Sequence, residues 1–194
     1  MKNGLIFYKP MMYIASYGAD GSIDTSSVMA IGPSRWDSDG LTLSAQPRTY
    51  DDETPAGTFT YLTGVREGHT LSGNLKVANM GELALLDGGT VGADKKHGQM
   101  AWGSNTSCPT LTDRAVVVVD LCDTENTAKM VKIDHCDIAV GTDDMTLGGS
   151  DPFVAPFSVY AHPSETAPAI LFGYAEAGKV FDPTTWTIGD PKSV

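Results

Sequence analysis

The sequence predicts a mainly β protein, organised as a β-sandwich or partial barrel with one short flanking α-helix and long loops. Of its 194 residues, 21 are glycine and 11 are proline, and this composition suits short strands joined by turns better than a helical bundle. Several segments alternate between apolar and polar residues, and a run of valines lies in the second half. Because no shift of composition marks a boundary, we expect a single domain over residues 1–194.

Two segments show the alternation most clearly. Leu41, Leu43 and Ala45 alternate with polar residues over 40–46, and residues 69–77 repeat the pattern. Period-two alternation is typical of a strand with one buried face.

The segment between these strands predicts a long loop over residues 46–57. An acidic stretch and Pro55 lie within it, and both disfavour a strand. Residues 59–62 form a further possible strand. The N-terminal segment 1–30 shows no sustained periodicity, so we expect it to be irregular.

One helix is predicted over residues 80–86. Asn79 can cap its first turn, Glu82 completes a capping box, and Gly88 with Gly89 provides a stop. Residues 90–113 have no period and predict a second long loop, which in a compact domain is usually functional or an interaction arm.

The second half predicts further strands. The valine run in 115–121 suits a strand covered on both faces, and it forms a hairpin with 130–138 across the polar residues 123–126. Strands are also predicted over 153–161 and 169–174. Pro156 indicates an edge strand or a bulge, and residues 182–194 predict an irregular tail anchored by Trp186.

The charge balance excludes a protein that grips nucleic acid. Thirteen Lys and Arg residues face 24 Asp and Glu residues, for a net charge of −11, whereas binding to phosphates requires basic clusters. The acidity either keeps the protein soluble or repels DNA where repulsion is wanted.

The three cysteines, Cys108, Cys122 and Cys136, do not predict a metal site. None forms a close pair of the C-x-x-C type, which zinc sites usually contain. The N-terminus lacks the features of a signal peptide, and no apolar run is long enough to span a membrane. We therefore expect reduced thiols, no metal, and synthesis in a cytoplasm.

The segment 173–179 spells G-x-x-x-x-G-K, but it lacks what a phosphate-binding loop needs. Val180 stands where Ser or Thr would hold magnesium, and Pro183 prevents a following helix. A hairpin turn is the better interpretation. Residues 37–40 likewise indicate a turn rather than a calcium loop. No G-x-S-x-G elbow is present and no histidine stands out, so we expect no catalytic residues and no cofactor.

The order of these segments resembles major tail tube proteins of phages with long non-contractile tails. The resemblance begins at 31–41, continues through the polar loop and the strand 69–77 into the helix 80–86, and closes with a hairpin and the strand 156–161. It rests on pattern and order over about 32–178, and not on a signature motif.

This resemblance implies a structural virion protein that forms stacked hexameric rings around a DNA passage. Its partners would be copies of itself, tape-measure and tail-tip proteins, and DNA only in transit, with no membrane contact. We then expect the loop 46–57 to contact other subunits through the following candidate residues: Gln46, Tyr50, Asp51, Asp52, Glu53, Pro55 and Gly57. Alternatives are a head decoration or baseplate protein, or a β-sandwich module that binds a ligand such as a carbohydrate.

Overall fold

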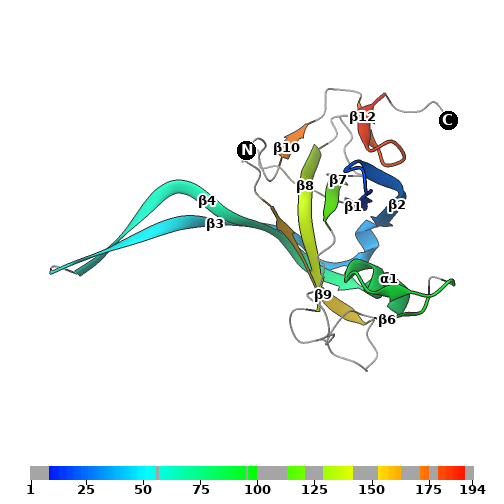
Figure 1. Ribbon diagram of the computed structural model, residues 1–194, viewed down its shortest axis with the longest axis horizontal. Coiled ribbons are helices and arrows are strands. Elements are labelled where there is room, and N and C mark those ends of the chain that lie inside the picture. The colour runs from blue at the N-terminus through cyan, green and yellow to red at the C-terminus, as the bar shows by residue number, and fades with distance from the viewer. Residues whose placement is uncertain are drawn as a thin grey trace.

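The computed structural model describes residues 9–55, 57–94, 96–99, 113–120, 129–141, 153–162, 171–174 and 179–190. Most of them belong to one antiparallel sheet (Figure 1). Its strands are β1 (Pro10–Tyr17), β2 (Ile23–Ile31), β3 (Trp36–Thr54), β4 (Gly57–Lys76), β7 (Arg114–Asp120), β8 (Lys129–Val140), β9 (Val154–Ala161) and β10 (Leu171–Tyr174). The fold is mainly β with one short α-helix, as the sequence predicted.

Small elements complete the described part. They are the 3-10 turn η1 (Pro33–Arg35), the helix α1 (Met80–Leu86), and two two-stranded hairpins, β5 (Thr90–Val91) with β6 (Gly98–Gln99) and β11 (Val180–Asp182) with β12 (Thr187–Gly189).

The main sheet is curled. Its strand order is β2-β1-β7-β8-β9-β4-β3, with β10 paired to β8. A flat sheet would hold β2 and β3 about 29 Å apart, but the chain from Ile31 to Trp36 can span at most about 18 Å. The two edges therefore come close at this end without pairing. The Trp36 indole donates to the Pro10 carbonyl oxygen at 3.3 Å, which ties β3 to β1 across the interior.

The core lies inside this curl. Phe157, Met12, Ile31, Leu75 and Ile133 are among its largest fully buried side chains. Strand β7 is buried along nearly its whole length, as the valine run predicted. Burial of this apolar surface, at about 25 cal/mol per Å², is the main stabilising contribution.

The helix α1 forms as predicted. The Asn79 side chain accepts from the Glu82 amide at 3.0 Å, and the Gly89 amide donates to the Ala84 carbonyl at 2.8 Å in a Schellman motif. Gly88 supplies the positive φ, 77°, that this motif requires. Leu83 and Leu86 are buried in the core.

The N-terminal segment is not irregular, contrary to the expectation for residues 1–30. Strand β1 pairs with both β2 and β7. A bulge in the β1–β2 pairing begins at Ile14, and the neighbours Ile14 and Ala15 are both buried. The alternation that marks a strand in the sequence is therefore broken.

Other predictions also need correction. Pro156 does not mark an edge strand, because β9 lies between β8 and β4. Pro156 lies just beyond the last β8–β9 pair, Val140 with Phe157, so the missing amide of the proline does not break a ladder hydrogen bond. The tail 182–194 is not wholly irregular, because residues 180–189 form a hairpin in which the Trp186 ring packs on Phe181.

One predicted loop and one predicted turn contain strand structure. Residues 90–113 include the β5–β6 hairpin, and residues 37–40 lie in β3 at a register shift rather than in a turn. The predicted strands 115–121, 130–138 and 153–161 are confirmed by β7, β8 and β9. The turn predicted at 123–126 and the cysteines Cys108 and Cys122 lie outside the described residues.

Candidate functional site: a projecting arm and a groove at the opposite edge

A two-stranded arm projects from the body of the protein (Figure 1). Strand β4 pairs with β9 from His69 to Lys76, but before His69 its described partner is β3 alone. We call residues 46–68 the arm. At about 3.4 Å per residue, the nine residues from Gln46 to Thr54 extend roughly 30 Å.

The arm contains the candidate contact residues, but not as the predicted loop. Gln46 through Glu53 lie in β3, Pro55 lies in the turn, and Gly57 begins β4 with φ of 128°. The acidic stretch pairs residue by residue with β4, from Asp51 with Thr60 to Glu53 with Thr58. Low β-propensity did not prevent this, because β3 is an edge strand, where polar residues are tolerated.

The register of the arm is continuous toward its turn. The two strands pair from Thr49 with Leu62 to Thr54 with Gly57, and these pairs include Tyr50 with Tyr61 and Asp52 with Phe59.

An isolated two-stranded ribbon has little intrinsic stability in water. The edges of a ribbon that pairs with no other described strand present backbone donors and acceptors to a further strand. Contact with another chain would therefore stabilise the arm.

The other edge of the sheet, β2, is shaped by a local network. Between Ile14↔Met29 and Ser16↔Asp24 the register shifts, so that residues 25–28 bulge from the ladder. The Ser16 amide donates to Ser27 Oγ at 2.9 Å, and the Ser26 amide donates to Asp24 Oδ1 at 2.9 Å. These bonds satisfy backbone groups that the ladder does not pair.

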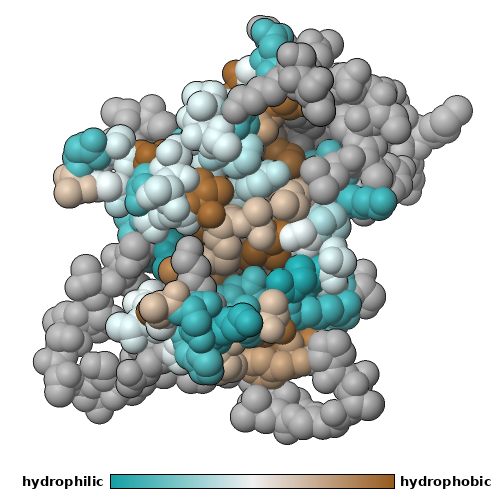
Figure 2. All heavy atoms as spheres, turned by 90° about the vertical axis from the view of Figure 1, so that its right-hand side faces the viewer, coloured by the Kyte–Doolittle hydropathy of each residue, from teal (hydrophilic) through white to brown (hydrophobic). Residues whose placement is uncertain are grey.

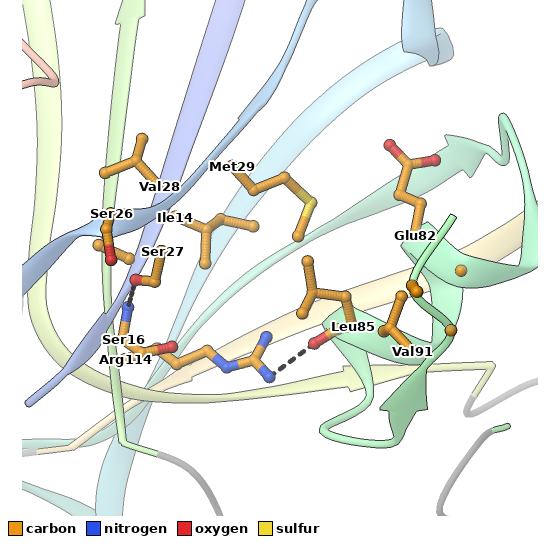
Figure 3. Close-up of a pocket in the computed structure, with 14 residues that line it drawn as sticks. Ile14, Ser16, Ser26, Ser27, Val28, Met29, Glu82, Leu85, Val91 and Arg114 are labelled. Carbon is orange, nitrogen blue, oxygen red and sulfur yellow. Dashed lines mark hydrogen bonds between the residues drawn. The ribbon is translucent and has the colours of Figure 1, made fainter. Parts of the chain in front are cut away.

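A groove of about 560 Å³ lies between β2 and α1 (Figure 3). Its lining includes Ile14, Met29, Leu85 and Val91, with Ser16, Ser26, Ser27 and Glu82 as polar members. Figure 2 shows apolar residues at the centre of this side of the molecule, next to a band of hydrophilic ones. The groove is therefore mainly apolar and open to solvent.

Arg114 fixes the helix that forms one wall of the groove. Its guanidinium donates to the Leu86 and Leu85 carbonyl oxygens at 2.9 and 2.8 Å, at the negative end of the α1 dipole. The residue is only 7% exposed, and this burial lowers the pKa of its guanidinium. Arg35 holds the first turn through an ion pair with Glu82 at 2.7 Å.

Two histidine–carboxylate pairs involve strand β8. His135 Nδ1 lies 2.6 Å from Asp113 Oδ2, and His162 Nε2 lies 2.7 Å from Asp137 Oδ2. Burial raises the pKa of the neighbouring Tyr17, which stacks on His135, to about 12. Both pairs link separate segments of the chain, and in the described residues no three His, Cys, Asp or Glu side chains gather as a metal site requires.

The thiol of Cys136 is buried, and desolvation raises its pKa to about 12. Its Sγ donates to the Arg114 carbonyl oxygen at 3.2 Å. A thiol held in this protonated form is a poor nucleophile.

The G-x-x-x-x-G-K segment is followed by a strand, and the hairpin turn predicted at Gly178 lies outside the described residues. Strand β11 follows Lys179 where a phosphate-binding loop would need a helix. Lys179 Nζ pairs with Asp190 Oδ1 at 2.8 Å across the base of the β11–β12 hairpin. Residues 175–178 lie outside the described part.

Sequence reasoning located the arm residues but not the groove. The groove-lining residues of β2 fall in a segment without periodicity, and α1 and β2 are brought together only by the curl of the sheet. No local signal in the sequence could have indicated it.

No helix in the described ranges is long and apolar enough to cross a membrane. No protein-family model matches the sequence, and no curated protein matches it. Among solved structures, the chain is similar to the PVC sheath/tube terminator of an extracellular contractile injection system in the extended state. That similarity has 8% identity and a TM-score of 0.44, and it covers 89% of this chain and 98% of the other.

The chain is also similar to a component of the PVC sheath-tube complex in the extended state, with 6% identity and a TM-score of 0.43, covering 90% and 95% of the two chains. Both likenesses are remote, and neither assigns a function to this chain.

Proposed function

We propose that this chain is a non-enzymatic structural protein that assembles with copies of itself into the tube of a phage-type tail. The observation that carries the proposal is the arm. A two-stranded ribbon roughly 30 Å long, paired with no other described strand, has little stability of its own and acquires it in an assembly.

The sheet itself supports head-to-tail assembly. Among the described strands, its two edge strands are β2 and β3, and these differ from each other. An interface that joins one edge of a copy to a different surface of the next is heterologous, and such interfaces close into rings or continue as filaments. Closure removes the exposed edges that otherwise promote aggregation.

The charge is consistent with a passage for DNA. A net charge of −11 per copy gives an assembly that repels phosphates overall, which would let DNA pass without binding. Hexameric rings, tape-measure and tail-tip partners, and residence in the virion tail belong to this proposal through the family resemblance.

Shortening the arm tests the proposal. Replacing residues 47–66 with Asn-Gly joins Gln46 to its partner Glu67 through a tight hairpin turn. We expect the full-length chain to form rings or tubes by electron microscopy and mass photometry, and the shortened chain to remain a folded monomer. The exchange Ile188→Ser, at an exposed apolar residue of β12, is the matched control and should assemble normally.

A full-length chain that stays monomeric at high micromolar concentration, with no polymers on the grid, would overturn the proposal. Normal assembly of the shortened chain would show that the arm is only a solvated surface.

A further inference from the structure

We propose that the groove between β2 and α1 binds an extended segment of a partner protein, with a carboxylate of that segment paired to Arg114. The carboxylate belongs to an Asp or Glu side chain, and apolar residues on either side of it contact the apolar lining of the groove. This proposal concerns the groove alone and does not depend on self-assembly of the chain.

The guanidinium of Arg114 is an incompletely paired cation in a nearly enclosed position. The residue is only 7% exposed, yet it lines the groove, and Figure 3 shows its side chain extending toward Leu85. Of the five N–H groups of a guanidinium, two donate here to the Leu85 and Leu86 carbonyl oxygens. The other three have no hydrogen-bond partner among the described residues.

The positive charge of Arg114 is compensated only in part. The C-terminal end of a helix carries about half of a negative elementary charge. Burial lowers the pKa of the guanidinium, and the charges of Asp87 and Asp137 oppose this, but neither of these carboxylates forms an ion pair with it. A buried cation is costly without a partner of opposite charge, and the fork of an arginine can bind a carboxylate through two hydrogen bonds. A carboxylate is therefore the ligand group that this position favours.

The rest of the lining favours an apolar segment with a single carboxylate. Met29, Leu85 and Val91 provide apolar surface, and Leu85 is 45% exposed although it is a large apolar residue. The Glu82 carboxylate also lines the groove, but it is paired with Arg35 at 2.7 Å. Because the whole chain carries a net charge of −11, a strongly acidic or phosphorylated partner would be repelled.

The position of β2 favours a peptide over a small carboxylate. Strand β2 is an edge strand of the described sheet, and Ser26, Ser27 and Met29 on it line the groove. A peptide that lies along an edge strand gains main-chain hydrogen bonds while alternate side chains enter pockets. The wall formed by α1 is already held by Arg114, and a preformed site lowers the entropy cost of binding.

Two peptide libraries test the proposal on the full-length chain. Both contain acetylated and amidated pentapeptides with four randomised flanking positions, and the central residue is Glu in one library and Gln in the other. We expect affinity selection on the immobilised chain to enrich apolar flanks from the Glu library. By isothermal titration calorimetry, the best Glu peptides should bind at least tenfold more tightly than their Gln counterparts.

A matched pair of variants on α1 locates the binding site. Leu85 lines the groove and Met80 does not, although their exposed fractions, 45% and 48%, are nearly equal. We expect Leu85→Gln to weaken binding of the best Glu peptide at least tenfold, and Met80→Gln to weaken it less than twofold. Arg114→Leu should remove the preference for Glu over Gln. If that variant does not fold, the α1 pair and the two libraries still decide the question.

Three outcomes would overturn the proposal. The first is that no Glu peptide binds better than its Gln counterpart, and the second is that the two α1 variants have equal effects. The third uses sodium octanoate, an apolar carboxylate without a peptide backbone. Tighter binding of octanoate than of every peptide would assign the groove to a small amphiphile instead of a partner protein.

Discussion

The body and the arm are built from the same antiparallel pairing, but they differ in how many described strands take part. In the body, β4 pairs with β3 on one side and β9 on the other, and Leu75 on it is fully buried. In the arm, the same strand pairs with β3 and with no other described strand. The body therefore gains stability from the burial of side chains between its strands, whereas a ribbon of two strands gains little from pairing alone.

From this difference we expect that shortening a side chain in the core of the body strongly lowers the free energy of unfolding. Phe157 is fully buried and packs on Trp36 with ring centroids 5.8 Å apart. We expect Phe157→Ala to lower the free energy of unfolding by about 3–5 kcal/mol, because it removes apolar contacts and leaves a cavity. Urea denaturation followed by circular dichroism measures the change.

Tyr160 on the same strand is 44% exposed and serves as the control. We expect Tyr160→Ala to change the free energy of unfolding by less than about 1 kcal/mol. Equal losses for the two variants would show that β9 has no distinct buried face.

Removal of a polar contact within the body should lower the free energy of unfolding by an intermediate amount. Arg114→Leu removes the donors to the Leu85 and Leu86 carbonyl oxygens. We expect a loss of about 2–3 kcal/mol in the free energy of unfolding, since these bonds involve a charged donor and the Leu86 bond is buried. Amides of α1 should also exchange faster with deuterium.

Lys132→Gln is the matched control, because Lys132 forms its 2.7 Å ion pair with Asp134 near the surface. The expected change is within about 0.5 kcal/mol. If Arg114→Leu is equally mild, Arg114 does not hold the helix.

Removal of the arm should reduce stability less than either Phe157→Ala or Arg114→Leu. Replacing residues 47–66 with Asn-Gly should change the free energy of unfolding of the monomer by less than about 1 kcal/mol, because no other described strand pairs with the arm and a two-stranded ribbon has little stability of its own. The urea midpoint of the shortened chain at monomeric concentration provides the measurement. A loss greater than about 2 kcal/mol would mean that the arm stabilises the body from within one chain.

The sequence predicted those parts of the fold whose signals are local. Asn79 and Glu82 predicted the start of α1, and the valines of β7 predicted a strand buried on both faces. Strand β1 was missed because a bulge breaks its alternation, and the polar strand β2 is defined by pairing with β1 rather than by its own residues. Those pairings are nonlocal, so a local pattern could not show them.

In the candidate site, too, the sequence predicted what local residues determine and missed the pairing between strands. The acidic residues Asp51, Asp52 and Glu53 correctly drew attention to the segment between two alternating strands, but their low β-propensity suggested a loop. A continuous ribbon forms because its outer edge faces solvent and tolerates charge. Whether these residues contact another subunit remains a prediction.

The pairing of β1 with β7 has a consequence for the newly made chain. Met12 pairs with Val118, roughly a hundred residues further along. A ribosome that adds 5–20 residues per second needs on the order of five to twenty seconds to supply that partner. Halfway through this interval the arm is also complete, while β1 still exposes the edge that β7 will cover. Until the second half of the sheet emerges, this edge is open to pairing with strands of other nascent chains.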